Sequence, residues 1–297
     1  MKKITLTILL ITTFGLTACS EQQVNEWACG HEMGQTRCNN LIVKAGENKE
    51  YDKARKYLEI SANYGNPKMQ AALGVSYQTG ELGHKKDYQK ALYWIQKSAE
   101  QGNATGQREL GLLYEKGFIV QQDYAKALEL YKKSAEQENI SAQNDLGRMY
   151  ADGKGVEQNY TKAVEWYRKS AEQGYVAAQV NLGKMYENGW GVGKDYKIAL
   201  QWYQKAAEEE YPNAQFAIGG FYDLGLGVEQ NYTLAFQWYE KAAQQGYALA
   251  QNAIADMYEN GQGVEKDLIK AKEYYQLACN SSMQKGCENL ERIKIEI

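Results

Sequence analysis

Only a few side chains in this sequence have the types and spacing that a catalytic site requires. Ser282 and Lys285 match the Ser-x-x-Lys motif of serine acyl-transfer enzymes, but no Ser-Asp-Asn or Lys-Thr-Gly segment accompanies them. His31 and His84 are the only histidines, so a histidine triad or metal site would lack its usual members, and we expect His84 to be a solvated loop residue. The acidic run Glu208–Glu210 is typical of a solvated helix end rather than an acid–base pair. We therefore predict no catalytic residues, no metal and no cofactor.

Glycine pairs with the spacing Gly-x-Gly could instead mark a phosphate-binding loop. A strand should precede such a loop, and the sequence indicates none. The pair also recurs at four equivalent places, namely Gly153/Gly155, Gly189/Gly191, Gly225/Gly227 and Gly261/Gly263. The glycines therefore belong to a repeat. Because the formal net charge is −3 and basic residues do not cluster, we expect no nucleic-acid partner.

The repeat has a period of 36 residues and the pattern of two helices. Its clearest columns are Leu110, Leu146, Leu182, Ile218 and Ile254, followed by Tyr114, Tyr150, Tyr186, Tyr222 and Tyr258. Helical spacing runs up to the first glycine of each pair, which predicts a left-handed helix cap. The N-caps predicted for the second helices are Asp87, Asp123, Asn159, Asp195, Asn231 and Asp267. A tryptophan column recurs once per unit, so we interpret it as packing between repeats: Trp94, Trp166, Trp202 and Trp238.

The pattern A-x-x-x-L-G-x-M-Y-x-x-G-x-G-V-x-x-[DN]-Y-x-K-A-x-x-W-Y-x-K-[AS]-A-E-x-G resembles the Sel-1-like repeat, a relative of the tetratricopeptide repeat. The resemblance extends from about Cys29 to Leu290. It implies an all-α fold, a right-handed superhelical solenoid of helix-turn-helix repeats of 36 residues. We expect an irregular N-terminal capping repeat at 29–66, six repeats at 67–283 and a C-terminal capping helix at 284–297. Residues 80–88 carry one residue more than the repeat.

The start of the chain has the features of a secretory signal. Lys2 and Lys3 precede an apolar run that is too short to span a bilayer. The end of this run, Leu-Thr-Ala before Cys19, resembles the bacterial lipoprotein box, which implies a signal peptide at 1–18, acylation of Cys19 and a lipid-anchored tether at 19–28. In diderm lipoproteins a serine after the cysteine, here Ser20, favours the outer membrane. A plain signal peptide with an incidental Cys19 is the alternative.

The other four cysteines form two close pairs, Cys29 with Cys38 and Cys279 with Cys287. In an oxidising compartment such pairs more often form disulfides than metal sites, and no histidine stands at metal spacing from either pair. In a stack of about a dozen helices spaced ~8–10 Å apart, Cys29 would lie far from Cys279, whereas a bridge requires Cα atoms within about 7 Å. We therefore expect Cys29–Cys38 and Cys279–Cys287. The cysteine-rich bacterial branch of the family places disulfides between consecutive helices at a similar spacing.

A solenoid presents its first helices as a concave surface, and positions that vary between repeats are candidates for partner contacts. The varying positions that we select there are Arg108, Leu112, Asn144, Arg148, Val180, Lys184, Phe216, Asn252 and Asp256. A second set places apolar side chains in the glycine loop, at Phe118, Trp190 and Leu226. Loop aromatics could anchor a partner or pack against the neighbouring helix, and the first set could also be a solvated face.

These features predict a non-catalytic protein-protein interaction module that is anchored in the cell envelope. Sel-1-like lipoproteins include immunity proteins against periplasm-active, lipase-like toxins delivered by type VI secretion, so the resemblance implies immunity as one concrete function. The alternatives are an envelope scaffold or a surface protein that binds a host factor, and an enzyme of penicillin-binding or β-lactamase type. The expected partner is a protein, a secreted toxin in the immunity case, and we expect no small-molecule substrate.

Overall fold

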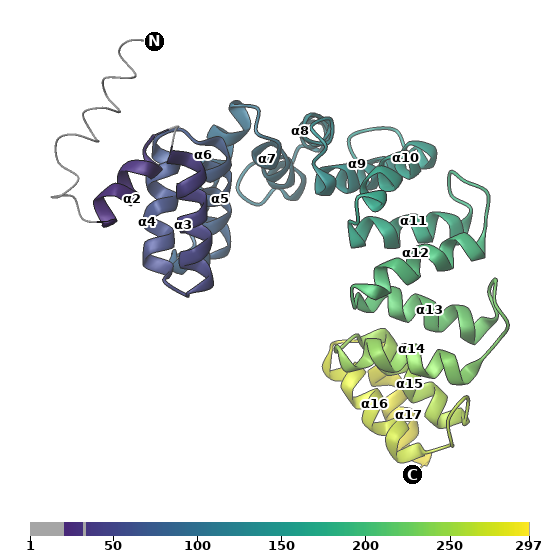
Figure 1. Cartoon of the computed structure of the whole chain (residues 1–297). Coiled ribbons are helices and arrows are strands. Elements are labelled where there is room, and N and C mark those ends of the chain that lie inside the picture. Colours follow the sequence, from purple (N-terminus) through teal and green to yellow (C-terminus); the bar gives the residue numbers. More distant parts are fainter. Residues whose placement is uncertain (1–20, 32–33, 297) are drawn as a thin grey trace, which may run out of the picture. The chain divides into compact units, whose positions relative to one another are not determined.

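The computed structural model describes residues 21–31 and 34–296, and this part of the chain is helical outside its turns (Figure 1). A short 3-10 helix, η2, spans Glu81–Gly83. The predicted signal peptide, Cys19 and Ser20 lie outside the described residues. None of the helices in the described ranges is long and apolar enough to cross a membrane. The α-helices are α2 Glu21–Cys29, α3 Gln35–Glu47, α4 Tyr51–Asn63, α5 Pro67–Thr79, α6 Tyr88–Glu100, α7 Ala104–Lys116, α8 Tyr124–Ala135, α9 Ile140–Asp152, α10 Tyr160–Glu172, α11 Val176–Asn188, α12 Tyr196–Glu208, α13 Pro212–Leu224, α14 Tyr232–Gln244, α15 Ala248–Asn260, α16 Leu268–Asn280 and α17 Gln284–Glu296.

The helices form two compact units, a first unit of α2 to α8 and a second unit of α9 to α17. Within each unit every helix packs against the next one along the chain. Figure 1 shows this succession most clearly in the second unit, where α11 to α17 lie one after another. The all-α fold of successive helix-turn-helix repeats predicted from the sequence is confirmed.

The predicted caps set the ends of the helices. All six Asp and Asn residues that precede the second helices accept a hydrogen bond from a backbone N–H in the first turn, for example Asp195 from Ile198 at 3.0 Å. First helices end at glycines with left-handed backbone angles, such as Gly189 with φ 73°. Both devices satisfy backbone groups that a helix end leaves unpaired, so the turn between the helices starts and stops at a defined residue.

A tyrosine of the second helix occupies the core of most repeats and donates a hydrogen bond to a carboxylate of the first helix. The pairs are Tyr131–Glu115 at 2.8 Å, Tyr203–Glu187 at 2.5 Å, Tyr239–Asp223 at 3.3 Å and Tyr275–Glu259 at 2.6 Å. Burial, followed by the neighbouring Glu187, raises the pKa of Tyr203 far above its usual range, so the hydroxyl remains a donor. The pairing lets these four repeats bury a large aromatic ring without an unsatisfied hydroxyl.

Two further hydrogen bonds join the helices of one repeat at their open end. In the α9–α10 repeat, Ser170 Oγ donates to the Ile140 carbonyl at 2.7 Å, and Gln173 Nε2 donates to Gln143 Oε1 at 2.9 Å. The same glutamine pair occurs as Gln101–Gln70, Gln137–Gln107 and Gln245–Gln215. In the α11–α12 repeat the donor position holds Glu209, and Gln179 Oε1 is buried without a hydrogen-bond partner.

We predict that Glu209→Gln stabilises the protein. The new amide can donate to Gln179 Oε1, which adds about 1 kcal/mol to the free energy of unfolding and raises Tm by ~2–4 °C. Glu208→Gln is the matched control, because it removes a neighbouring acid from the same helix end without reaching the glutamine pair. Thermal unfolding followed by circular dichroism measures both variants, and equal shifts would mean that charge alone is responsible.

Disulfides fasten the first and last helices in the described part of the chain. Cys29–Cys38 joins α2 to α3 with Cα atoms 4.8 Å apart, and Cys279–Cys287 joins α16 to α17 with Cα atoms 4.5 Å apart. Both bridges are the ones expected from the sequence. Terminal helices of a repeat stack have a neighbour on one side only, so a covalent link there replaces packing that internal helices receive from both sides.

Candidate partner-binding groove

The structure buries three of the residues that we selected as surface candidates. Asn144 is 7% exposed, Val180 3% and Asn252 5%. Asn181 donates to Asn144 Oδ1 at 2.9 Å, and Asn289 to Asn252 Oδ1 at 3.1 Å, so this face of the first helix packs against the next repeat. A partner on the surface cannot reach these three side chains, and we remove them from the candidate site.

Several other candidates take part in packing within the stack. Phe216 is half-buried against the rings of Tyr239 and Tyr247, with centroids 5.3 and 5.5 Å away. Asp256 Oδ1 lies 2.5 Å from the Tyr275 hydroxyl, and Asp256 Oδ2 accepts a hydrogen bond from Asn252 at 2.9 Å. The remaining members of this group are half-buried: Arg108, which pairs with Glu109 at 2.7 Å, Leu112, and Leu226, which packs against a core cluster.

The remaining second-unit candidates, Arg148, Lys184 and Trp190, line one surface groove of about 560 Å³. The helices α9, α10 and α11 and the glycine loop after α11 form its walls. We call it the aromatic–cationic groove, and its lining is Arg148, Ala151, Asp152, Lys154, Gln158, Tyr160, Tyr167, Asn181, Lys184, Met185 and Trp190.

Trp190 forms an aromatic platform at the edge of this groove. Its ring stacks on Tyr160, with centroids 5.4 Å apart and planes at 13°, and its side chain is still 43% exposed. Gly191 permits this approach, because a Cβ at that position would lie 2.4 Å from the Tyr160 carbonyl carbon, and its φ of 70° also favours glycine. The sequence left open whether loop aromatics pack back or stay exposed, and Trp190 does both. Phe118 behaves similarly in the first unit, edge-on to Tyr88 and 63% exposed.

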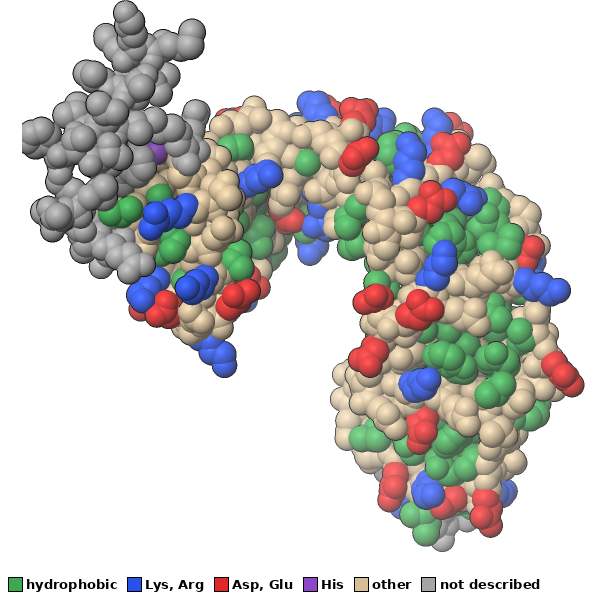
Figure 2. Space-filling model, viewed as in Figure 1, with side chains coloured by type: hydrophobic (Ala, Val, Ile, Leu, Met, Phe, Trp, Pro, Cys, Tyr) green, Lys and Arg blue, Asp and Glu red, His purple; other side chains and the backbone are tan. Residues whose placement is uncertain are grey.

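Cationic side chains outnumber carboxylates in the aromatic–cationic groove. Arg148, Lys154 and Lys184 line it together with one acid, Asp152. Asp152 lies 3.0 Å from the Lys154 amine, Asp145 lies 3.9 Å from the Arg148 guanidinium, and Lys184 is exposed. On the face of the second unit visible in Figure 2, single basic and acidic side chains alternate between apolar patches. The positive excess of the groove is therefore local, in a chain whose formal net charge is −3.

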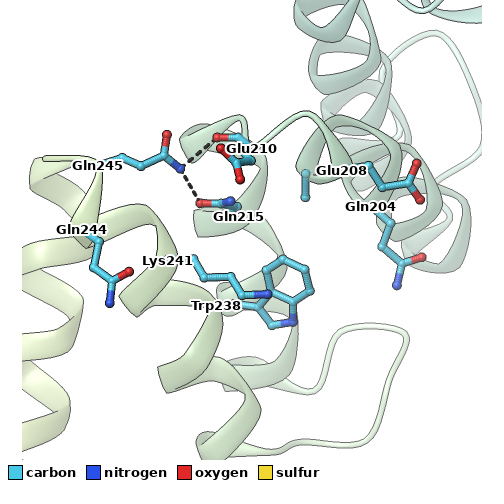
Figure 3. Close-up of a pocket in the computed structure, with 9 residues that line it drawn as sticks. Gln204, Glu208, Glu210, Gln215, Trp238, Lys241, Gln244 and Gln245 are labelled. Carbon is cyan, nitrogen blue, oxygen red and sulfur yellow. Dashed lines mark hydrogen bonds between the residues drawn. The ribbon is translucent and has the colours of Figure 1, made fainter.

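A larger surface pocket of about 730 Å³ lies among α12, α13 and α14 (Figure 3). Lys241 extends its amine over the Trp238 ring at 4.2 Å, and Gln245 donates to Gln215 Oε1 and to the Glu210 carbonyl. The same lysine–tryptophan contact recurs at Lys169–Trp166 and Lys205–Trp202, both at 4.3 Å. Because these groups engage one another and belong to the repeat, we do not place a binding site there.

His84 is not the solvated residue that we expected. Its side chain is 5% exposed, with Nδ1 2.7 Å from Ser76 Oγ and Nε2 3.1 Å from Glu59 Oε1. The extra residue of this loop lets it fold back through η2, so that the ring also reaches Tyr77, at 4.3 Å between centroids.

Serine, histidine and glutamate are the residue types of a catalytic triad, but Ser76 is 3% exposed and its hydroxyl donates to the Glu81 carbonyl at 2.9 Å. A substrate cannot reach that hydroxyl, so the trio fastens the loop. Ser282, by contrast, is exposed at φ 62° in the turn before α17. Within the described ranges, no three His, Cys, Asp or Glu residues are grouped to hold a metal ion.

We predict that His84→Ala lowers the free energy of unfolding by about 2 kcal/mol, because a buried ring with two polar partners is removed. The loop around η2 should become more sensitive to protease. His31→Ala is the control, since that histidine is exposed, and it should change stability by less than ~0.5 kcal/mol. Urea denaturation of both variants measures the difference, and an unchanged midpoint for His84→Ala would show that the trio does not hold the loop.

The Sel1 repeat sequence profile matches residues 45–66, 67–103, 104–139, 140–175, 176–211, 212–247 and 248–283. The chain belongs to the Sel1 repeat family. No curated protein matches this Sel1 repeat protein. Among solved structures, it is 37% identical to c5321, a protective antigen of uropathogenic Escherichia coli with an SLR fold, at a TM-score of 0.71. That alignment covers 80% of this chain and 51% of the other, so the chain spans about half the length of the E. coli protein.

A Sel1 repeat protein from Oxalobacter formigenes is 34% identical, with 82% of this chain and 70% of the other covered at a TM-score of 0.69. The immunity protein PA5088 of Pseudomonas aeruginosa is 20% identical, with 71% and 82% covered at a TM-score of 0.50, which is a likeness of fold alone. The Sel1 repeat is a fold that serves protein-protein interaction. Sel1 repeat proteins are generally non-catalytic interaction modules.

Proposed function

We propose that this protein is a non-catalytic envelope lipoprotein that captures a protein partner in the aromatic–cationic groove. The observation that carries the proposal is the meeting of Arg148, Lys184 and Trp190 in one groove. Arg148 and Lys184 occupy one position of consecutive repeats that holds Leu112, Gly220 or Asp256 elsewhere, and Trp190 also lies at a position that varies, whereas repeated positions serve packing and capping. A half-exposed aromatic platform beside cationic side chains has the composition of a binding hot spot.

Immunity to a toxin that acts in the periplasm is the more specific form of this proposal. The lipoprotein box would place the protein in the compartment of such a toxin, and an immunity protein of P. aeruginosa shares the fold. Binding of a host factor is the second candidate, because the E. coli relative is a protective antigen and an antigen must be accessible to antibodies. A lipase-like toxin encoded beside this protein would favour immunity.

The proposed location in the cell envelope can be tested separately. We expect mature protein to begin at an acylated Cys19, because the residues before it match the lipoprotein box. Mass spectrometry of the membrane fraction should find the lipid there, and Cys19→Ala should move the protein out of that fraction. Retention of Cys19→Ala in the membrane would contradict acyl anchoring.

Photo-crosslinking tests the proposed function directly. With p-benzoylphenylalanine in place of Lys184, the full-length protein in living cells should form an adduct with one protein partner. Trp190→Ala should weaken the purified complex by ~2 kcal/mol or more, since truncating a central aromatic anchor has that effect. Phe118→Ala removes the corresponding loop aromatic of the first unit and is the matched control. The crosslinker is also placed at position 118 for comparison. Adducts at position 118 but not at 184, or normal binding by Trp190→Ala, would place the interface elsewhere.

A further inference from the structure

The aromatic–cationic groove contains the one exception to the tyrosine–carboxylate pairing among the second helices from α8 to α16. The carboxylate partners Glu115, Glu187, Asp223 and Glu259 occupy one column of the first helices, and the corresponding residue of α9 is Ala151. Tyr167, the core tyrosine of α10, is therefore left without the carboxylate that its counterparts have. Its side chain is 3% exposed, and it lines the groove together with Ala151.

The environment of Tyr167 favours a carboxylate as the missing partner. Burial, followed by the charge of Asp152, raises the pKa of Tyr167, so its hydroxyl is a donor at any physiological pH. Asp152 itself lies 3.0 Å from the Lys154 amine. Two further cations line the same groove: Arg148, which lies 3.9 Å from the Asp145 carboxylate, and Lys184, which is exposed. A buried donor beside several cations attracts an anionic acceptor more strongly than a neutral one.

A protein segment suits this groove better than an isolated ion. The volume of about 560 Å³ exceeds that of a single carboxylate, and the half-exposed ring of Trp190 lies at its edge. A side chain next to the acid can pack on that ring while the acid reaches Tyr167. Asn181 and Gln158 also line the groove and already donate to Asn144 Oδ1 and to the Ala151 carbonyl, so their side-chain oxygens can accept from backbone N–H groups of the segment.

We infer that the partner inserts an aspartate or glutamate side chain at the place that Ala151 leaves open, where the carboxylate accepts a hydrogen bond from Tyr167 and pairs with Lys184. This inference rests on the proposed function and specifies the chemistry of the partner. The other repeats satisfy their core tyrosine with an internal carboxylate, whereas in the α9–α10 repeat the partner provides this acceptor.

A blocked peptide tests the inference on the intact mature protein. The probe is a short fluorescent peptide of alternating glutamate, glycine and tyrosine, acetylated and amidated at its ends so that only side chains carry carboxylates. Its affinity, measured by fluorescence anisotropy, should exceed that of the same peptide with glutamine by about tenfold. Tyr167→Phe should weaken binding of the glutamate peptide about fivefold. Tyr203→Phe, whose hydroxyl bonds Glu187, should leave the affinity unchanged.

Ala151→Glu is the decisive variant, because it fills the open place from within the chain. It should raise Tm by ~2–4 °C and reduce affinity for the glutamate peptide at least tenfold, so that lost binding cannot be attributed to unfolding. Equal binding of the two peptides, no binding of the glutamate peptide, or a raised Tm with unchanged affinity would each overturn the inference. If a crosslinked protein partner binds Ala151→Glu as tightly as the parent protein, the proposed function holds and the carboxylate inference is wrong. If the glutamate peptide binds but no protein partner is crosslinked, the carboxylate site holds and the proposed function is wrong.

Discussion

Gly191→Ala should destabilise the second unit by about 3 kcal/mol and lower Tm by roughly 10 °C. Two effects add in the same direction. The φ of 70° is strained for any residue with a Cβ, and that Cβ would lie within 2.4 Å of the carbonyl group of Tyr160 and 2.6 Å from the Thr161 nitrogen. Backbone atoms at a helix start cannot rotate away as a side-chain end can, so the loop must leave α10. Trp190 would move with it, and we expect partner binding to be lost as well.

Gly193→Ala provides a matched control for this prediction. It lies two residues further along the same loop, and a Cβ there would meet no atom within 4 Å. The substitution should be neutral or slightly stabilising, because it reduces the entropy of the unfolded chain. Thermal unfolding of both variants, followed by circular dichroism, separates the two cases. Similar melting temperatures for Gly191→Ala and the parent protein would mean that the loop does not depend on contact with α10.

Replacing Cys279 and Cys287 together by serine should lower the free energy of unfolding by about 2.5 kcal/mol, as expected from the chain entropy of a short closed loop. The bridge spans a sequence separation of 8 and ties α17 to the stack, where Leu290 and Ile293 are buried. Guanidinium unfolding of the double variant should therefore begin with loss of α17, and amide exchange in that helix should accelerate.

Reduction of a variant that lacks Cys29 and Cys38 serves as the control for the double variant. Dithiothreitol should reproduce the destabilisation when Cys29 and Cys38 are replaced beforehand, so that Cys279–Cys287 is the bridge being opened. Non-reducing peptide mapping should recover both native links. Free thiols at Cys279 or Cys287 in protein purified without a reductant would contradict this account.

The helical framework was predictable because each of its contacts is repeated. A cap such as Asp195, or a close approach such as that of Gly183 to Tyr203, recurs at fixed spacing. The same residue types therefore recur at equivalent positions of the sequence. The repeat length was sufficient to predict which residues end the helices. The bridges were also predictable, since helix spacing limits which cysteines can meet.

The candidate site was only partly predictable, since a first helix is packed on several sides and its exposed face is narrow. Val180 and Asn144 vary between repeats as surface residues do, yet contacts with the next repeat bury them. The extra residue before Asp87 was visible, but not that it lets His84 reach Ser76. Ala151 was also visible as an exception in its column. The consequence of this exception could not be predicted, because the sequence does not show that Tyr167 and Ala151 line the same groove.

The two helix hairpins that line the aromatic–cationic groove differ in the hydrogen bonds that join their helices. In the α9–α10 hairpin, Ser170 and Gln173 tie the second helix to the first. The α11–α12 hairpin has Ala206 and Glu209 at the corresponding positions and makes neither bond, and it carries Lys184 and Trp190. The α11–α12 hairpin therefore has fewer hydrogen bonds between its helices at this end, although Tyr203 still bonds Glu187 nearer the glycine loop. Partner capture should reduce local opening of this hairpin, so that amide hydrogen exchange in α11 slows in the complex.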